Sequence, residues 1–185
     1  MVVDSHKIKK FLYLFVVVFC ALVFETVEAT EKGVNIYAYS REVPSKVIFN
    51  VQGQKVKLSD FSGKFLMVVF WSRYCVPCIR ELKSLNTFAN KTKNDGFKVI
   101  LVSDKKEWKG GMDEQKRVLA KYGAQDLEAY VDNRGDLAAA FGIFSSPVTV
   151  LISRKGKEIG RIRGSADWDE EGVIEYMYKI KAEHG

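Results

Sequence analysis

The stretch FLMVVFWSRYCVPCIREL, residues 65–82, joins an apolar run to a charged segment and places Cys75 and Cys78 between them. Its first part, residues 65–71, is apolar at every position and rich in branched and aromatic side chains, which predicts a strand buried on both faces. Beyond Cys75 the apolar residues recur at spacings of three and four, which predicts a helix that begins near Cys75 and tolerates Pro77 in its first turn. The apolar face of this helix comprises Ile79, Leu82, Leu85, Phe88 and Ala89.

The rest of the chain alternates between patterns typical of strands and of helices. KVIFNVQGQKVKL, residues 46–58, predicts a hairpin around Gly53. Further strands are predicted at 97–103, 129–131, 148–153 and 158–163, and further helices at 113–123, 135–142 and 169–181. This order indicates an α/β fold in three layers, with a mixed central sheet, helices on both faces and an N-terminal β-hairpin extension.

The amino-terminal segment is typical of an export signal. Lys7, Lys9 and Lys10 precede an apolar run, residues 11–24, and the small-residue site VEA ends at Ala29. As a helix the run would reach about 21 Å, short of the roughly 30 Å hydrocarbon core, which favours a cleaved signal peptide over a full span. An uncleaved membrane anchor is the alternative, and either would place the rest of the chain outside the cytoplasm.

Three parts of the chain are therefore predicted: a signal peptide or anchor at 1–29, a lead-in with weak signals at 30–45, and one domain at 46–185. Removing residues 1–29 from the 185 leaves 156, enough for a single domain with a sizeable core. We interpret Cys20 as an apolar filler of the signal, so two cysteines remain for an oxidising compartment.

The chain carries a formal net charge of +6. Such a charge is compatible with acidic partners or an anionic membrane surface. Its Lys and Arg residues are scattered singly, however, and no basic patch interleaved with aromatic residues is present, so a solvated basic surface is favoured and nucleic-acid binding is not expected.

The cysteine pair is compatible with only one of four chemistries. A zinc site needs four ligands, and both histidines, His6 and His184, lie at the ends of the chain. Haem attachment requires a histidine directly after the second cysteine, where Ile79 stands. A purely structural disulfide would close too short a loop to stabilise the fold much. Reversible thiol-disulfide chemistry remains, with no metal and no cofactor beyond the Cys75–Cys78 disulfide itself.

The position of the pair predicts different roles for its two sulfur atoms. At a helix amino end, unpaired N–H groups and the helix dipole stabilise a thiolate, so Cys75 is the predicted nucleophile. Cys78, one turn further on and behind Pro77, is the predicted shielded partner that resolves the mixed disulfide. Arg73 and Arg80 flank the pair and would favour the thiolate, or they are simply solvated surface charges.

Trp71 and Tyr74 are candidates for an apolar collar that fits a substrate protein against Cys75, although packing alone would equally explain Trp71.

FWSRYCVPCIREL, residues 70–82, resembles the motif of the thioredoxin superfamily, and within it the TlpA/ResA-like extracytoplasmic thiol-disulfide oxidoreductases. The similarity extends over 47–180 and includes LSDFSGK before the buried strand, SSPVTVLISRKGKEIGRIRG after it, and Trp168 before the last helix. Leu82 and Tyr74 depart from the usual proline and tryptophan of the motif, which leaves partner specificity open.

The resemblance implies roles for residues far from the cysteines. Pro147 matches the cis-proline that lies beside the redox pair, and Ser146 then offers its backbone to a substrate strand. Together with Trp71 and Tyr74, the substrate-binding residues implied are Val76, Pro77, Ser146 and Pro147.

Glu81 matches a glutamate that accepts a proton from the buried thiol, although an ion pair with Lys83 or Arg80 on the helix surface is an equal alternative. Val69 stands where cytoplasmic thioredoxins carry a buried aspartate, so Glu81 or water would have to do the work of that base.

The function implied is an extracytoplasmic protein-disulfide reductase that acts on apocytochrome c or copper-chaperone thiols and receives electrons from a membrane donor of the thiol-transporter type. The alternatives are a periplasmic dithiol oxidase and a non-catalytic binding module. The peroxiredoxin motif, with a threonine three residues before the reactive cysteine, is not matched by Ser72. A copper-carrying relative would show a longer cysteine spacing and a late histidine within the folded part.

Overall fold

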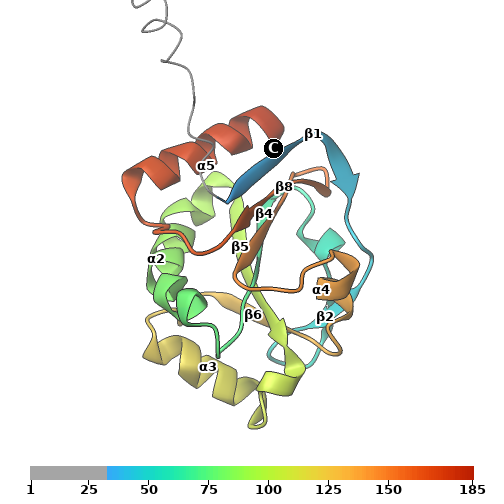
Figure 1. Cartoon of the computed structure of the whole chain (residues 1–185), viewed down its shortest axis with the longest axis vertical. Coiled ribbons are helices and arrows are strands. Elements are labelled where there is room, and N and C mark those ends of the chain that lie inside the picture. Colours follow the sequence, from blue (N-terminus) through green and yellow to red (C-terminus); the bar gives the residue numbers. More distant parts are fainter. Residues whose placement is uncertain (1–32) are drawn as a thin grey trace, which may run out of the picture. The chain divides into compact units, whose positions relative to one another are not determined.

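The computed structural model describes residues 33–185 (Figure 1). Their strands form one eight-stranded sheet in the order β1-β8-β7-β4-β5-β6-β2-β3. β4, β5 and β6 are parallel, and the other neighbouring strands pair antiparallel. The strands are β1 (Val34–Glu42), β2 (Val47–Phe49), β3 (Lys55–Lys57), β4 (Phe65–Phe70), β5 (Phe97–Asp104), β6 (Glu128–Asp132), β7 (Val148–Ile152) and β8 (Lys157–Arg163).

Helices cover both faces of this sheet. α2 (Val76–Thr92), α3 (Gly111–Lys121) and α5 (Glu171–His184) pack on one face, and the short α4 (Asp136–Ala140) packs on the other (Figure 1). Three single turns of 3₁₀ helix, η1 (Leu58–Phe61), η2 (Lys93–Asp95) and η3 (Lys105–Glu107), complete the elements of residues 33–185. The predicted three-layer fold with a mixed sheet is confirmed.

β4 divides the core because successive side chains of a strand point to opposite faces. Phe65, Met67 and Val69 belong to the cluster under α2 and α5, and Leu66, Val68 and Phe70 belong to the cluster under α4. All six residues of β4 are buried. The strand is therefore fixed from both sides, and the chain that leaves it at Trp71 starts from a rigid position.

The helices and strands lie within a few residues of their predicted bounds. The hairpin around Gly53 forms as β2 and β3, and it joins the main sheet through the pairing of Phe49 with Val131 on β6. α5 begins two residues later than predicted and continues to His184.

The lead-in contains a strand that the sequence pattern did not predict. β1 pairs antiparallel with β8 along the edge of the sheet, with a register shift between Ile36 and Arg41. Most of its side chains are exposed, so it lacks the apolar alternation from which a strand is recognised.

The predicted signal or anchor and Cys20 lie outside the described residues. Within residues 33–185, every helix is too short or too polar to span a bilayer.

Candidate functional site

Cys75 lies where the chain passes from β4 into α2, and it is the N-cap residue of that helix. The backbone N–H of Cys78 donates a hydrogen bond to the Cys75 sulfur, over 3.2 Å. This bond forms because Cys75 is extended while the next residues are already helical, with Pro77 in the first turn. The Cys75 sulfur thus sits at the positive end of a seventeen-residue helix.

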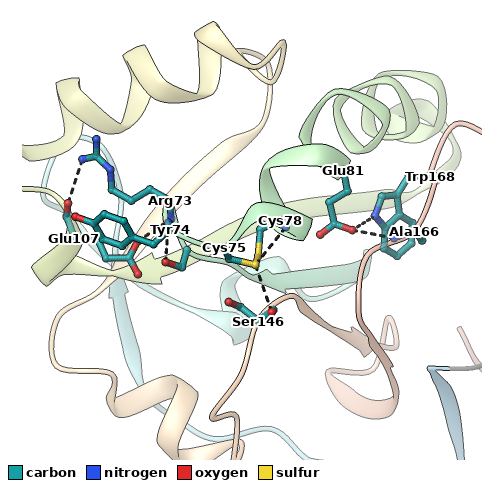
Figure 2. The surroundings of a disulfide bond; sticks show 10 residues. Arg73, Tyr74, Cys75, Cys78, Glu81, Glu107, Ser146, Ala166 and Trp168 are labelled. Carbon is teal, nitrogen blue, oxygen red and sulfur yellow. Dashed lines mark hydrogen bonds between the residues drawn. A yellow bond between two sulfur atoms is a disulfide. The ribbon is translucent and has the colours of Figure 1, made fainter.

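The two cysteines are joined by a disulfide (Figure 2), and they differ in exposure. Cys78 is completely buried in the cluster under α2, whereas Cys75 is partly exposed. A partner molecule can therefore approach only the Cys75 sulfur from solvent. The shielded position of Cys78 agrees with the sequence, and the roles of nucleophile and resolving thiol stay a prediction.

The loop before β7 brings Ser146 and Pro147 to the redox pair. The Cys75 sulfur lies 3.4 Å from the carbonyl oxygen of Ser146, and Figure 2 shows the two side by side. The Ser146–Pro147 peptide bond is cis, as the resemblance implies. Segments separated by about seventy residues thus meet at one sulfur atom.

Glu81 lies one turn after Cys78 on the same helix, and its side chain is buried. One carboxylate oxygen, Oε2, accepts hydrogen bonds from the indole Nε1–H of Trp168 (2.9 Å) and from the N–H of Ala166 (3.1 Å) (Figure 2). The other oxygen, Oε1, is buried with no hydrogen-bond partner among the described residues. An ion pair with Arg80 or Lys83, the alternative left open above, does not form.

Burial raises the pKa of Glu81 from 4.5 to about 7, because desolvation disfavours the charged carboxylate. The hydrogen bonds from Trp168 and Ala166 act in the opposite direction and are outweighed. A carboxyl group with this pKa can both accept and release a proton near neutral pH.

The aromatic residues before Cys75 point in different directions. Tyr74 is 74% exposed, and Val76 after the cysteine is 66% exposed, so both present apolar surface beside the disulfide. Trp71 is buried and packs against Trp108, with ring centroids 5.6 Å apart. Packing accounts for the position of Trp71, while Tyr74 and Val76 remain free to contact a partner.

The charge of Arg73 is engaged by groups on α3 and η3. The Arg73 guanidinium forms an ion pair with Glu114 on α3 at 2.5 Å. It also donates to the backbone carbonyl of Glu107 (Figure 2). Arg80 is exposed on the surface of α2. The sequence allowed two roles for these arginines: favouring the Cys75 thiolate, or lying solvated on the surface. Arg73 fits neither, because its charge is engaged in a contact with α3.

Two residues of this region were missed by sequence reasoning. Phe144 is 89% exposed and lies two residues before Ser146, and an apolar residue between a helix and the SSP turn was the only signal for it. Trp168 was noted only as part of the resemblance, but its indole directly holds Glu81. Val69 is buried in β4, so this strand supplies no titratable group next to Cys78.

The sheet order, the cysteine pair at the start of α2 and the cis-proline turn opposite it define a protein of the thioredoxin superfamily. Solved structures agree with this class. The exposed lipoprotein thioredoxin of Streptococcus pneumoniae strain TIGR4 matches with a TM-score of 0.59 and 25% identity over 74% of this chain and 98% of that one. A Chlorobium tepidum protein, provisionally described as thiol:disulfide interchange protein DsbE, matches with a TM-score of 0.64 and 25% identity over 76% and 95%.

The chain belongs to the redoxin family, whose model matches residues 39–177. Within the superfamily it is similar to thiol-disulfide oxidoreductases named ResA. The relative from Bacillus thuringiensis subsp. konkukian (strain 97-27) is 29% identical over 143 residues, which cover 76% of this chain and 77% of the relative. The relative from Bacillus subtilis (strain 168) is 24% identical over 172 residues, which cover 91% and 90%.

Proposed function

We propose that this protein is an extracytoplasmic thiol-disulfide oxidoreductase that reduces disulfides in partner proteins. The observation that carries the proposal is the asymmetry of the pair: Cys75 is accessible at the amino end of α2, and Cys78 is buried behind it. The names of the ResA relatives support the same activity.

The reaction proceeds in two exchanges from the dithiol form. The Cys75 thiolate attacks one sulfur of a substrate disulfide, forming a mixed disulfide and releasing the other substrate sulfur as a thiolate that takes a proton. The Cys78 thiolate then attacks the Cys75 sulfur, closes the internal disulfide and releases the second substrate thiolate. Two electrons pass from the protein to the substrate, and a membrane donor of the thiol-transporter type restores the dithiol.

Glu81 serves as the proton acceptor for Cys78 in this scheme. Both residues lie on the same face of α2, because residues three apart in a helix are neighbours. The unpartnered Oε1 of Glu81 and a pKa of about 7 support the role, since the carboxylate is a stronger base than an ordinary glutamate and is still about half ionised at neutral pH. No cofactor beyond the disulfide takes part.

The substrates are proteins, bound along Ser146 and Pro147 and against the apolar surface of Tyr74, Val76 and Pro77. Apocytochrome c and copper-chaperone thiols are the substrate classes that we propose. The lysines and the apolar run before Ala29 support export by an amino-terminal signal, retained or cleaved.

Insulin reduction with dithiothreitol as donor, measured together with the midpoint potential, tests this function. We expect turnover and a potential near the thioredoxin value of about −270 mV, far from the value of about −120 mV typical of strong oxidants.

A potential at the oxidising end would make the protein a dithiol oxidase of exported proteins. If the Cys75–Cys78 disulfide forms and breaks but insulin is not reduced, the protein would be only a binding module.

A further inference from the structure

A groove opens beside the disulfide, at the carboxyl ends of β4, β5 and β6. Its volume is about 380 Å³. Phe70, Ile143 and the exposed Phe144 contribute apolar surface, and Ser146 forms the wall that lies against the Cys75 sulfur. A polypeptide bound at Ser146 therefore extends directly into this groove.

The charges that line the groove are of one sign. Asp104, Glu107 and Asp132 line it, and none of its lining residues is a lysine or an arginine. This arrangement contrasts with the formal charge of the chain, which is +6. The groove is thus a local acidic site on a basic protein.

The partners of these carboxylates are backbone amides. Asp104 accepts from the N–H of Lys106 at 2.8 Å, and Glu107 accepts from the N–H of Arg73 at 2.9 Å. None of the three acids of the groove forms an ion pair within residues 33–185.

One cation, Arg73, contacts a groove residue from outside the lining, because its guanidinium donates to the backbone carbonyl of Glu107 at 3.3 Å. The Arg73 guanidinium pairs with Glu114, and Lys105 and Lys106 are exposed residues of η3 that do not line the groove.

Asp132 provides an independent indication of a ligand. The residue is 2% exposed, and its Oδ2 accepts from the N–H groups of Leu137 and Ala138 at the start of α4. Its Oδ1 has no hydrogen-bond partner among the described residues. A buried carboxylate oxygen left unpaired is costly, so a donor that enters the groove would be bound favourably.

We propose that this groove binds a lysine or arginine side chain of the substrate protein, close in sequence to the cysteine that Cys75 attacks. The ammonium or guanidinium group meets Asp104, Glu107 and Asp132, while its methylene stem lies along Phe144. The inference rests on the proposed function and adds a substrate preference to it: disulfides flanked by a cationic residue are selected.

The test uses single-cysteine peptides joined by a disulfide to 2-mercaptoethanol, a neutral leaving group. The peptides come in sets of three that differ at one position, which carries Lys, Gln or Glu. One set is made for each of the two positions on either side of the cysteine. The pre-reduced protein is mixed with each peptide, and the second-order rate constant of reduction is measured at low salt and at high salt.

At the best position we expect the Lys peptide to react about fivefold faster than the Gln peptide and the Glu peptide to react more slowly. High salt should bring the three rate constants together, because it screens partly exposed charges.

The variants test whether the groove causes this preference. In the double variant Asp104→Asn/Glu107→Gln, the Lys-to-Gln rate ratio should fall towards one. In Asp136→Asn, which removes one negative charge from α4 outside the groove, the ratio should stay as in the wild type. Asp104→Lys should raise the relative rate of the Glu peptide.

Equal rates for the Lys and Gln peptides at every position would overturn the groove proposal while leaving the proposed function intact. Failure of the protein to reduce any of the peptides, including the neutral one, would count against the proposed function itself. Asp132→Asn should also lower the Lys-to-Gln rate ratio, and an unchanged ratio in a variant with the circular dichroism of the wild type would remove Asp132 from the site.

Discussion

Carboxylates lie on both sides of the Cys75–Cys78 disulfide, but their surroundings differ. Glu81 is enclosed behind Cys78, held by Trp168 and Ala166, and its pKa is raised to about 7 by burial. The acids of the groove lie in front of Cys75, where they are bound only by backbone amides. The same chemical group therefore suits proton transfer on the enclosed side and recognition of charge on the open side.

The two sides of the disulfide also differ in their cysteines, and Cys78→Ala is the strongest test of the different roles of Cys75 and Cys78. Without the resolving thiol, turnover should fall by a factor of about 10³ or more, because the mixed disulfide on Cys75 has no internal partner to release it. Substrate proteins should accumulate as covalent adducts of Cys75, identified by mass spectrometry after non-reducing electrophoresis. Adducts that instead accumulate on Cys78 in Cys75→Ala would reverse the assignment of the two roles.

Glu81→Gln tests the enclosed side. It keeps an acceptor for Trp168 and Ala166 but cannot accept a proton, so release of the mixed disulfide should slow by about 100-fold above pH 7. In the wild type this rate should rise with pH through about 7, as Glu81 ionises, and in the variant the rise should be lost. Rapid-quench measurement of the second exchange checks this, and an unchanged profile would remove Glu81 from the reaction.

Although Glu81→Gln should slow the reaction, it should stabilise the folded protein at alkaline pH. Because the pKa of Glu81 is raised from 4.5 to about 7 by folding, the wild type loses stability as the pH rises through this interval, by up to about 3 kcal/mol. The variant should lack this loss and be more stable than the wild type at pH 8. Urea unfolding at pH 5 and pH 8 measures the difference, and a steeper loss in the variant would contradict it.

Trp168→Phe should have a smaller effect. It removes the indole N–H that stabilises the Glu81 carboxylate, so the pKa of Glu81 should rise by about one unit and the pH profile of the second exchange should move with it. The profile of the Glu81→Gln variant should not move when Trp168→Phe is added, and this double variant is the control.

The smallest effect is expected for Arg73→Gln. Because the guanidinium is paired with Glu114, its removal should change the fraction of Cys75 thiolate at neutral pH by less than about twofold. Thiolate absorbance at 240 nm monitors this fraction, and Arg80→Gln is the matched control. A large drop for Arg73→Gln alone would mean that Arg73 turns towards Cys75 in the reduced protein.

The fold could be predicted because its signals are local. The doubly buried strand at 65–70 and the apolar face of α2 are each visible within one segment, and together they place the cysteines. β1 was not predicted, because its side chains are mostly exposed.

The groove could not be predicted for a different reason. Asp104, Asp132 and Phe144 come from separate segments and meet only after the parallel strands align. Likewise, burial of Glu81 by Trp168, far along the chain, is a property of the folded protein and not of the motif around it.

The contact between β1 and β8 determines where an independently folding unit can begin. The hydroxyl of Tyr37 on β1 donates to Glu158, which is buried and forms an ion pair with Arg161, and Arg161 in turn donates to the carbonyl of Phe141 after α4. A truncated chain that starts at residue 46 would leave this ionic cluster open to water and expose the edge of β8 to pairing with other molecules. Expression of the domain for the experiments above should therefore start no later than Gly33.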